Sequence, residues 1–213
     1  MKLKVCGMKY IDNINAVAQL QPDYLGFIFY EKSSRFFDSE IPEISSEIKK
    51  VGVFVNAGLE YIVKTINTHN LHGIQLHGQE SPDFINNLKQ MILGSEINNL
   101  EIVKVFSMKD HFDFSVLKAY EDICDYFLFD TKGKLPGGNG YTFNWDVLNS
   151  YPSTKPYFLG GGIGPNEIKK LKHFKRTDAA KYCHAIDVNS KFEIEAGLKN
   201  TNELEKFKYE LQH

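Results

Sequence analysis

The chain has few cysteines, and they are poorly placed for pairing. Its 213 residues include only Cys6, Cys124 and Cys183, with no C-x-x-C spacing among them. An odd number of widely spaced cysteines argues against a disulfide scaffold and against a structural zinc site. We therefore expect no metal, and we expect the protein to work in the reducing cytoplasm.

Long hydrophobic runs and an excess of one charge are also missing. No apolar run approaches the ~18 residues of a membrane helix, and the first residues do not follow the pattern of a signal peptide. The 25 basic and 27 acidic residues leave a net charge of −2, without a basic stripe. These absences argue against a membrane or a nucleic acid as partner. Any bound anion must be held by local geometry rather than by the overall charge of the protein.

What the chain does have is enough apolar sequence for one large core. Hydrophobic residues make up 42% of it, and no linker, low-complexity segment or charge block divides it. Single α/β barrels commonly run to ~200–250 residues. We expect one domain over residues 1–213.

Short apolar segments rich in β-forming residues recur along the whole chain. Several, such as residues 51–55 and 126–129, are apolar throughout rather than alternating. Continuous apolarity is what a parallel strand covered on both faces needs. The predicted strands are Lys2–Cys6, Tyr24–Phe29, Lys50–Val55, Gly73–His77, Ile102–Phe106, Tyr126–Asp130, Tyr157–Leu159 and Ala185–Val188.

The segments between these strands have the pattern of amphipathic helices. Residues 12–20 place apolar side chains on one face, and residues 202–211 do the same near the end of the chain. Ser81 followed by Pro82 is a strong helix start. Eight strand–helix alternations over this length predict an α/β fold, a single-domain (β/α)8 TIM barrel, rather than an open doubly wound sheet.

In such a barrel the chemistry lies at the carboxyl ends of the strands. Cys6 ends the first strand, His77 the fourth and Asp130 the sixth, so we expect these side chains to gather at one mouth. A thiol at that mouth can exchange protons with a substrate, whereas the same thiol in the core is inert. Gln75 and His77 predict a polar lining there, because no carboxylate near them completes a metal-ligand set.

Two loops at this mouth predict an anion site. After the seventh strand, the run Gly160-Gly161-Gly162 lets backbone amides approach an anion, and the helix that begins near Pro165 adds a favourable amino end. Asn189 and Ser190 follow the eighth strand and add amide and hydroxyl donors. Glycines also suit a plain tight turn, but barrels frequently bind phosphate between these two loops. The placement therefore favours phosphate.

Two further segments after strands carry predictions. Arg35 has a planar guanidinium that can hold two carboxylate or phosphate oxygens, although a loop arginine is often only a solvated surface residue. Its neighbours Phe36 and Phe37 are expected to line a flat aromatic ligand. The glycine-rich segment 133–142, directly after Asp130, is interpreted as a lid over the site rather than an ordinary loop.

Together these segments closely resemble the phosphoribosylanthranilate isomerase family of tryptophan biosynthesis. The matching motifs run in order over essentially the whole chain, and their combination is specific to that family. They are KVCGM at 4–8, DYLGFIFYEKSSRFF at 23–37, VGVFVN at 51–56, IQLHGQE at 74–80, LFDTKG at 128–133, GGNGYTFNW at 137–145, FLGGGI at 158–163 and AIDVNSKFE at 185–193.

The resemblance implies an isomerase that needs no cofactor. In that family N-(5-phosphoribosyl)anthranilate becomes 1-(2-carboxyphenylamino)-1-deoxyribulose 5-phosphate by an Amadori rearrangement, the third step from chorismate to tryptophan. By the family's motifs, Cys6 corresponds to the general base, Asp130 to the general acid, and Arg35 to the partner of the anthranilate carboxylate. The phosphate site corresponds to residues of the last two loops, Gly161, Gly162 and Ser190. Further substrate contacts are expected from Gln75, His77 and Asn189.

Physical chemistry sets conditions on these roles. Asp130 must be protonated part of the time, which the apolar residues 127–129 would favour by raising its pKa. Cys6 acts as a base only as a thiolate, so nearby donors must lower its pKa toward neutrality. Lys4 lies two residues before Cys6 and also points into the barrel, where it either favours the thiolate or pairs with a core carboxylate.

The chain departs from the family pattern in two places. Ser34 stands where many members have proline, and Asn189-Ser190-Lys191 replaces the frequent Ser-Ser-Gly of the eighth-strand loop. Two other functions stay open: another phosphosugar isomerase or epimerase, which would call for metal-binding histidines and an aspartate pair, and a barrel that binds a phosphosugar without turnover. The oligomeric state is either a monomer or a homodimer.

Overall fold

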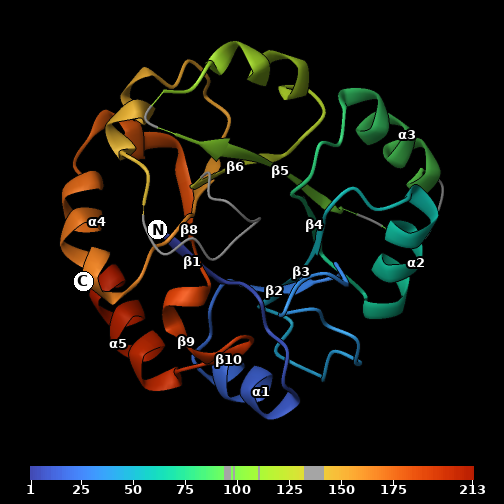
Figure 1. Cartoon of the computed structure of the whole chain (residues 1–213), viewed down its shortest axis with the longest axis horizontal. Coiled ribbons are helices and arrows are strands. Elements are labelled where there is room, and N and C mark those ends of the chain that lie inside the picture. The colour runs from blue at the N-terminus through green and yellow to red at the C-terminus, as the bar shows by residue number, and fades with distance from the viewer. Residues whose placement is uncertain (94–96, 98, 110, 132–141) are drawn as a thin grey trace.

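Eight parallel strands close into a barrel, as the sequence predicts (Figure 1). The computed structural model describes residues 1–93, 97, 99–109, 111–131 and 142–213. Consecutive strands pair in chain order, and β1 pairs with β8 to complete the ring. The strands are β1 (Lys2–Val5), β2 (Tyr24–Ile28), β3 (Lys49–Phe54), β4 (Gly73–Leu76), β5 (Glu101–Met108), β6 (Tyr126–Thr131), β7 (Tyr157–Leu159) and β8 (Cys183–Val188).

Helices surround this barrel on the outside (Figure 1). The predicted helices over 12–20 and 202–211 are confirmed within one residue at both ends. The predicted helix start at Ser81 is confirmed too, since the Ser81 hydroxyl accepts a hydrogen bond from the Phe84 N–H at the start of α3. The α-helices are α1 (Ile11–Gln19), α2 (Leu59–His69), α3 (Pro82–Ile92), α4 (Ile168–Phe174) and α5 (Thr201–Gln212). Short 3₁₀ turns are η1 (Phe114–Tyr120), η2 (Trp145–Ser150), η3 (Pro165–Glu167), η4 (Asp178–Tyr182) and η5 (Ser190–Phe192).

The expectation of a helix after every strand is wrong. Residues 29–48, all of which the structure describes, connect β2 to β3 without an α-helix. This stretch contains Pro42 and two serine pairs, which interrupt helical hydrogen bonding and compete with it. In the described parts of the segments after β5 and β6, the chain forms the 3₁₀ turns η1 and η2 and no α-helix. The irregular β2–β3 connection carries Arg35, so it brings a functional side chain rather than a packing surface.

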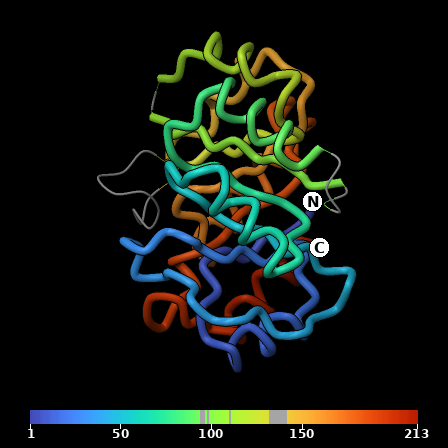
Figure 2. Tube along the Cα trace, turned by 90° about the vertical axis from the view of Figure 1, so that its right-hand side faces the viewer, coloured from blue at the N-terminus to red at the C-terminus, as the bar shows by residue number. Residues whose placement is uncertain are grey.

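The two ends of the chain lie side by side. Figure 2 shows the blue beginning and the red end of the trace together in the lower half of the view, and helices α1 and α5 are in contact. After β8 the chain adds a small antiparallel hairpin, β9 (Glu193–Glu195) with β10 (Leu198–Lys199), before α5 begins. The hairpin is fixed to α1, because the Asn13 side chain bonds both the N–H and the C=O of Lys199.

Apolar side chains fill the barrel below its mouth. The interior cluster is separate from the larger core between strands and helices. Its buried members are Tyr24, Val51, Val103, Val105, Leu128, Phe158 and Ala185. Because side chains alternate along a strand, the residues two positions beyond several of these point into the mouth. Asp130 and Asp187 follow Leu128 and Ala185 in this way.

A histidine sits at the amino end of the barrel, in contact with the interior cluster. His184 Nε2 lies 2.9 Å from the Tyr24 hydroxyl, and its ring is half-buried beside Tyr126. Burial, with Lys2 and Lys49 nearby, lowers the pKa of His184 to about 4. A histidine in the unfolded chain titrates near ~6.5. The unfolded chain therefore binds this proton first as pH falls, and folding stability present above pH ~6.5 is lost toward pH ~4.

We predict that His184→Gln removes part of the acid sensitivity of the fold. Between pH 7 and pH 4.5 the unfolding free energy should fall by about 1–2 kcal/mol less in the variant than in the wild type, because solvent still screens the half-buried ring. Urea unfolding followed by circular dichroism measures this difference. His173→Gln, at an exposed histidine, should follow the wild type; parallel curves for His184→Gln and wild type would contradict the prediction.

Candidate active site

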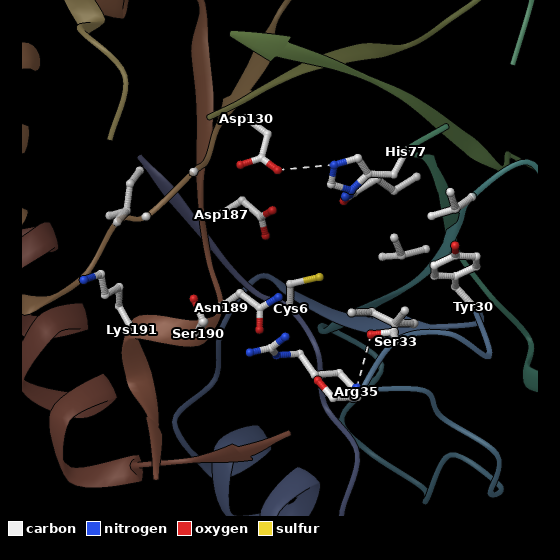
Figure 3. A pocket seen from close by; sticks show the side chains of 18 of the residues that line it. Cys6, Tyr30, Ser33, Arg35, His77, Asp130, Asp187, Asn189, Ser190 and Lys191 are labelled. Carbon is white, nitrogen blue, oxygen red and sulfur yellow. Dashed lines mark hydrogen bonds and ion pairs between the residues drawn. The ribbon is translucent and has the colours of Figure 1, made fainter. Parts of the chain in front are cut away.

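A cavity of about 500 Å³ opens at the carboxyl ends of the strands (Figure 3). This volume is within the range of small-molecule sites, ~300–1,000 Å³. All nine predicted site residues line it: Cys6, Arg35, Gln75, His77, Asp130, Gly161, Gly162, Asn189 and Ser190. The sequence-based expectation that they gather at one mouth is confirmed.

Cys6 lies at the end of β1 and faces this cavity (Figure 3). Its N–H donates to the Val188 carbonyl at 2.8 Å, so the β1–β8 pairing fixes its backbone. Gly7 turns the chain away with φ +74°, and a Cβ there would lie 2.5 Å from Asn189 Oδ1 and 2.9 Å from Arg35 Cδ. The glycine therefore lets the loops that carry Asn189 and Arg35 close around the thiol.

The Lys4 ammonium is buried beside the thiol and pairs with Asp187 at 2.8 Å. Lys4 therefore does both things that the sequence left open: it pairs with a core carboxylate, and its charge favours the thiolate. Burial lowers the pKa of Lys4, but Asp187 and Cys6 more than offset it, so that pKa lies above its ordinary value. Burial raises the pKa of the Cys6 thiol, while Lys4 opposes the rise. The expected net lowering toward neutrality is not found, because desolvation outweighs the nearby ammonium.

Asp187 is a site residue that sequence reasoning missed. It lines the cavity, and its charge acts on both Asp130 and Cys6. The spacing along the chain could have revealed it. Asp187 in β8 stands two residues before Asn189, so both side chains are expected to point into the barrel.

Asp130 is held from two sides. One oxygen, Oδ1, accepts the Thr131 N–H at 2.8 Å, and the other, Oδ2, lies 3.2 Å from His77 Nε2 (Figure 3). His77 is therefore more than a polar lining residue, because it contacts the proposed acid directly. Both side chains are about one-seventh exposed, at 14% and 15%, and this exposure is toward the cavity they line.

A buried ion pair fixes the loop that carries His77. Lys104 donates to Glu80 at 3.0 Å and to the Gly78 carbonyl at 2.8 Å. The Glu80 carboxylate in turn accepts the N–H groups of Gly78 and Asn56. All of these contacts lie among β5 and the segments that follow β3 and β4. The loop after β4 therefore holds its shape without a ligand.

Gln75 lies at the floor of the cavity, only 2% exposed. Its Oε1 has no hydrogen-bond partner among the residues that the structure describes. A buried amide oxygen without a partner costs free energy, about 1–3 kcal/mol. The oxygen can therefore accept a hydrogen bond from a group in the cavity.

Arg35 is already engaged by the protein. Its Nε and Nη2 donate to both oxygens of Glu193 at 2.6–3.0 Å. The aromatic prediction for its neighbours is wrong: Phe37 is buried in the core against Phe27, and Phe36 borders a separate hollow. Both side chains therefore lie outside the cavity, because the irregular segment after β2 directs Phe37 into the core and Phe36 toward that hollow. The apolar lining comes instead from other strand ends, Ile28, Tyr30, Val53, Val55 and Ile163.

The glycine loop after β7 has the conformation that only glycine adopts easily. Gly161 and Gly162 have φ +85° and +71°, and a Cβ on Gly161 would lie 2.3 Å from the Thr131 nitrogen. The expected helix amino end differs in detail, because η3 spans three residues and the Gly164 N–H is bonded by the Glu167 carboxylate at 2.8 Å. The Gly164 N–H is therefore already engaged, and on this side we expect an anion to be bound by the glycine loop itself.

The eighth-strand loop accommodates its departures from the family pattern. Lys191 belongs to η5 and does not have a positive φ, so no glycine is required there. It lines the cavity beside Ser190, where it adds a positive charge. The segment interpreted as a lid, 133–142, lies outside the described residues except for Thr142. Among the described residues, no group of three His, Cys, Asp or Glu side chains is arranged to hold a metal ion.

We predict that Lys4 controls the reactivity of the thiol. Replacing it with the uncharged Lys4→Met should slow alkylation of Cys6 by iodoacetamide at pH 9 by about tenfold, because loss of the ammonium raises the pKa of the thiol further and lowers the thiolate fraction. Peptide mapping by mass spectrometry gives the rate for each cysteine. Lys104→Met, which removes an equally buried ammonium away from Cys6, is the matched control. An unchanged Cys6 rate in Lys4→Met would contradict the prediction.

The architecture and the sequence both match known proteins. The family model for N-(5'-phosphoribosyl)anthranilate (PRA) isomerase matches residues 3–209. The N-(5'-phosphoribosyl)anthranilate isomerase of Parabacteroides distasonis is 39% identical, over 100% of this chain and 94% of its own length. The crystal structure of phosphoribosyl anthranilate isomerase from Thermotoga maritima superposes with a TM-score of 0.81 at 24% identity, covering 100% of this chain and 98% of that one.

A second solved relative carries a ligand. It is a phosphoribosyl anthranilate isomerase in complex with reduced 1-(o-carboxyphenylamino)-1-deoxyribulose 5-phosphate, with a TM-score of 0.76 and 21% identity over 100% of this chain and 98% of that one. At these identities the two structures show that the fold is shared. The family model matches nearly the whole chain, and the Parabacteroides distasonis protein is 39% identical over all of it. These two findings identify the family as well as the fold. The chain belongs to the N-(5'-phosphoribosyl)anthranilate isomerase family.

Proposed function

We propose that residues 1–213 form one catalytic domain that converts N-(5-phosphoribosyl)anthranilate to 1-(2-carboxyphenylamino)-1-deoxyribulose 5-phosphate. The observation that carries the proposal is that Cys6 and Asp130, two groups able to transfer protons, line one cavity with Arg35 and the glycine loop. Such a cavity offers an acid, a base and two separate places for anions. The substrate has a carboxylate at one end and a phosphate at the other.

The first step needs an acid. Asp130 delivers a proton to the oxygen of the ribose ring, the C1–O bond breaks, and the anthranilate nitrogen becomes a Schiff base. The contact with His77 Nε2 and the Thr131 N–H hold the Asp130 carboxyl in one orientation toward the cavity. A fixed donor reduces the reorganisation needed when the ring opens.

The second step needs a base. Cys6, as a thiolate, removes the proton from C2 of the sugar, and the electron pair moves to the Schiff-base nitrogen to give an enolamine. Tautomerisation to the ketone then yields the product. Because burial keeps most of the thiol protonated at neutral pH, the Lys4 ammonium is what makes the thiolate accessible.

Binding energy comes from the two ends of the substrate. We place the carboxylate at Arg35 and the phosphate between the glycine loop, Gly161 and Gly162, and Ser190. Gln75 and Asn189 are assigned to the sugar between them. Gln75 Oε1, which has no partner among the described residues, can accept a hydrogen bond from a sugar hydroxyl. Holding both ends aligns C2 and the ring oxygen with the two proton-transfer groups.

The alternative phosphosugar epimerase has weaker support. Asp130 and Asp187 both line the cavity, which is one feature such an enzyme would need. However, Lys4 already pairs with Asp187, and His77 contacts Asp130. These partners suit an acid and an electrostatic support better than a ligand set.

Partners and compartment follow from the same reasoning. The described residues contain no helix long and apolar enough to cross a membrane. We propose a phosphoribosyl small molecule as the only ligand, with neither cofactor nor nucleic acid. We also propose the cytoplasm as the compartment, since Cys6, Cys124 and Cys183 are all free thiols.

Removing either proton-transfer group should abolish turnover without abolishing binding. We predict that Cys6→Ser and Asp130→Asn each lower kcat by about 10²–10⁴-fold, as expected for loss of a general base or acid. The loss of anthranilate fluorescence measures the reaction. Cys124→Ser, at a buried thiol outside the cavity, should keep the wild-type rate. Equal rates in wild type and both variants would refute these roles, and a wild type without turnover would favour a barrel that only binds.

The glycine loop after β7, where we place the phosphate, allows a matched pair of glycine variants. A Cβ on Gly161 would overlap the Thr131 backbone at φ +85°, whereas on Gly160 it would make only ordinary contacts of 3.4–3.6 Å. We predict that Gly161→Ala lowers kcat/KM by about 10–100-fold through roughly 1–3 kcal/mol of strain. Gly160→Ala should stay within about threefold of the wild type. Equal effects of the two substitutions would contradict the assignment.

A further inference from the structure

Four polar side chains form a continuous chain along one wall of the cavity. Arg35 donates to Glu193, and Lys199 Nζ donates to Glu193 Oε1 at 2.7 Å. The same Nζ donates to Asn189 Oδ1, also at 2.7 Å. Arg35 and Asn189 line the cavity, whereas Glu193 and Lys199 stand behind them.

Lys199 is the unexpected member of this chain. Its side chain is fully buried, at 0% exposure, and Asn13 fixes its backbone through hydrogen bonds of 2.7 and 2.9 Å. Burial lowers the pKa of Lys199 to about 8, while Glu193 opposes this, so the amine is mostly charged at neutral pH. Burying an ammonium costs free energy, and its attraction to neighbouring charges must offset that cost.

The charges around Arg35 indicate what the Lys199 ammonium does. Glu193 grips the guanidinium through two of its nitrogens, but on its own this carboxylate would cancel the positive charge that a ligand carboxylate needs. Lys199 neutralises Glu193 and restores one net positive charge to the group. Lys4, a second buried ammonium close to the cavity, is already paired with Asp187.

We propose that Lys199 is a positioning residue that makes the site selective for a ligand with a carboxylate. Through Lys199, Glu193 can hold Arg35 in place without weakening its attraction for that carboxylate. Lys199 itself does not touch the ligand. The inference rests on the proposed function, which places the aromatic carboxylate at Arg35.

A merely structural Lys199 would act differently. If it only tied the β9–β10 hairpin to the loop after β8, its loss would weaken every ligand of the cavity alike. The electrostatic role concerns only a ligand that carries the carboxylate. Two ligands that differ in this one group therefore separate the two roles.

The test is isothermal titration calorimetry with two ligands. One is reduced 1-(o-carboxyphenylamino)-1-deoxyribulose 5-phosphate, and the other is the same compound without its carboxyl group. We expect the wild type to bind the first more tightly by about tenfold or more. In Lys199→Met this preference should fall at least about fivefold, while the Kd of the carboxyl-free ligand stays within about twofold.

Further variants test whether the charge of Lys199 is responsible. Lys199→Arg keeps the charge and should keep the preference. The double variant Glu193→Gln with Lys199→Met again has one net positive charge at Arg35, and should recover the preference to within about threefold of the wild type. Should Lys199→Met not fold, Glu193→Gln carries the test alone, because it adds positive charge and should raise the preference.

Each other outcome is decisive. An unchanged preference in Lys199→Met, equal losses for both ligands, no recovery in the double variant, or a lowered preference in Glu193→Gln would overturn the inference. A wild type that binds the two ligands equally would instead overturn the placement of the carboxylate at Arg35, which belongs to the proposed function.

Discussion

The pairing of β1 with β8 is the constraint on which the site depends. It joins residues that are far apart in the chain: Val5 lies beside Val188, and Lys4 lies beside Asp187. Closure removes the free edges that an open sheet would expose. It also places Cys6, at the end of the first strand, next to the loop after the last one. Without this pairing, the thiol and its ammonium neighbour would lie at one edge of a sheet, and the glycine loop after β7 would lie near the other edge.

Buried ion pairs then shape the mouth of the barrel. In the part of the chain that the structure describes, three ammonium groups are almost fully enclosed, and each has a carboxylate partner at 2.7–3.0 Å: Lys4 with Asp187, Lys104 with Glu80, and Lys199 with Glu193. Such pairs contribute little net stability, because desolvation consumes most of the attraction. Their value here is geometric and electrostatic. They fix the thiol, the His77 loop and the Arg35 side chain before any ligand arrives.

How far the sequence leads differs between the strands and the connections. The eight strands are readable because a parallel strand covered on both faces must be apolar along its length, as in residues 51–55. The same reasoning fails for residues 29–48, where a helix is absent and the chain follows no periodic pattern. It fails also for Phe36 and Phe37, since whether an aromatic side chain faces the cavity or the core depends on how the irregular segment crosses the barrel rim.

The sequence alone determined the order of the strands, the residue types at their carboxyl ends and hence the set of groups that meet at the mouth. Strand alternation and the direction of parallel strands are local rules, so Cys6, His77 and Asp130 follow from position. Only the tertiary structure decided how these groups are paired. That Lys4 bonds Asp187 across the closure, that His77 contacts Asp130, and that Glu193 and Lys199 stand behind Arg35 are all long-range contacts. Their energies depend on burial and on neighbouring charges, which no local pattern in a sequence contains.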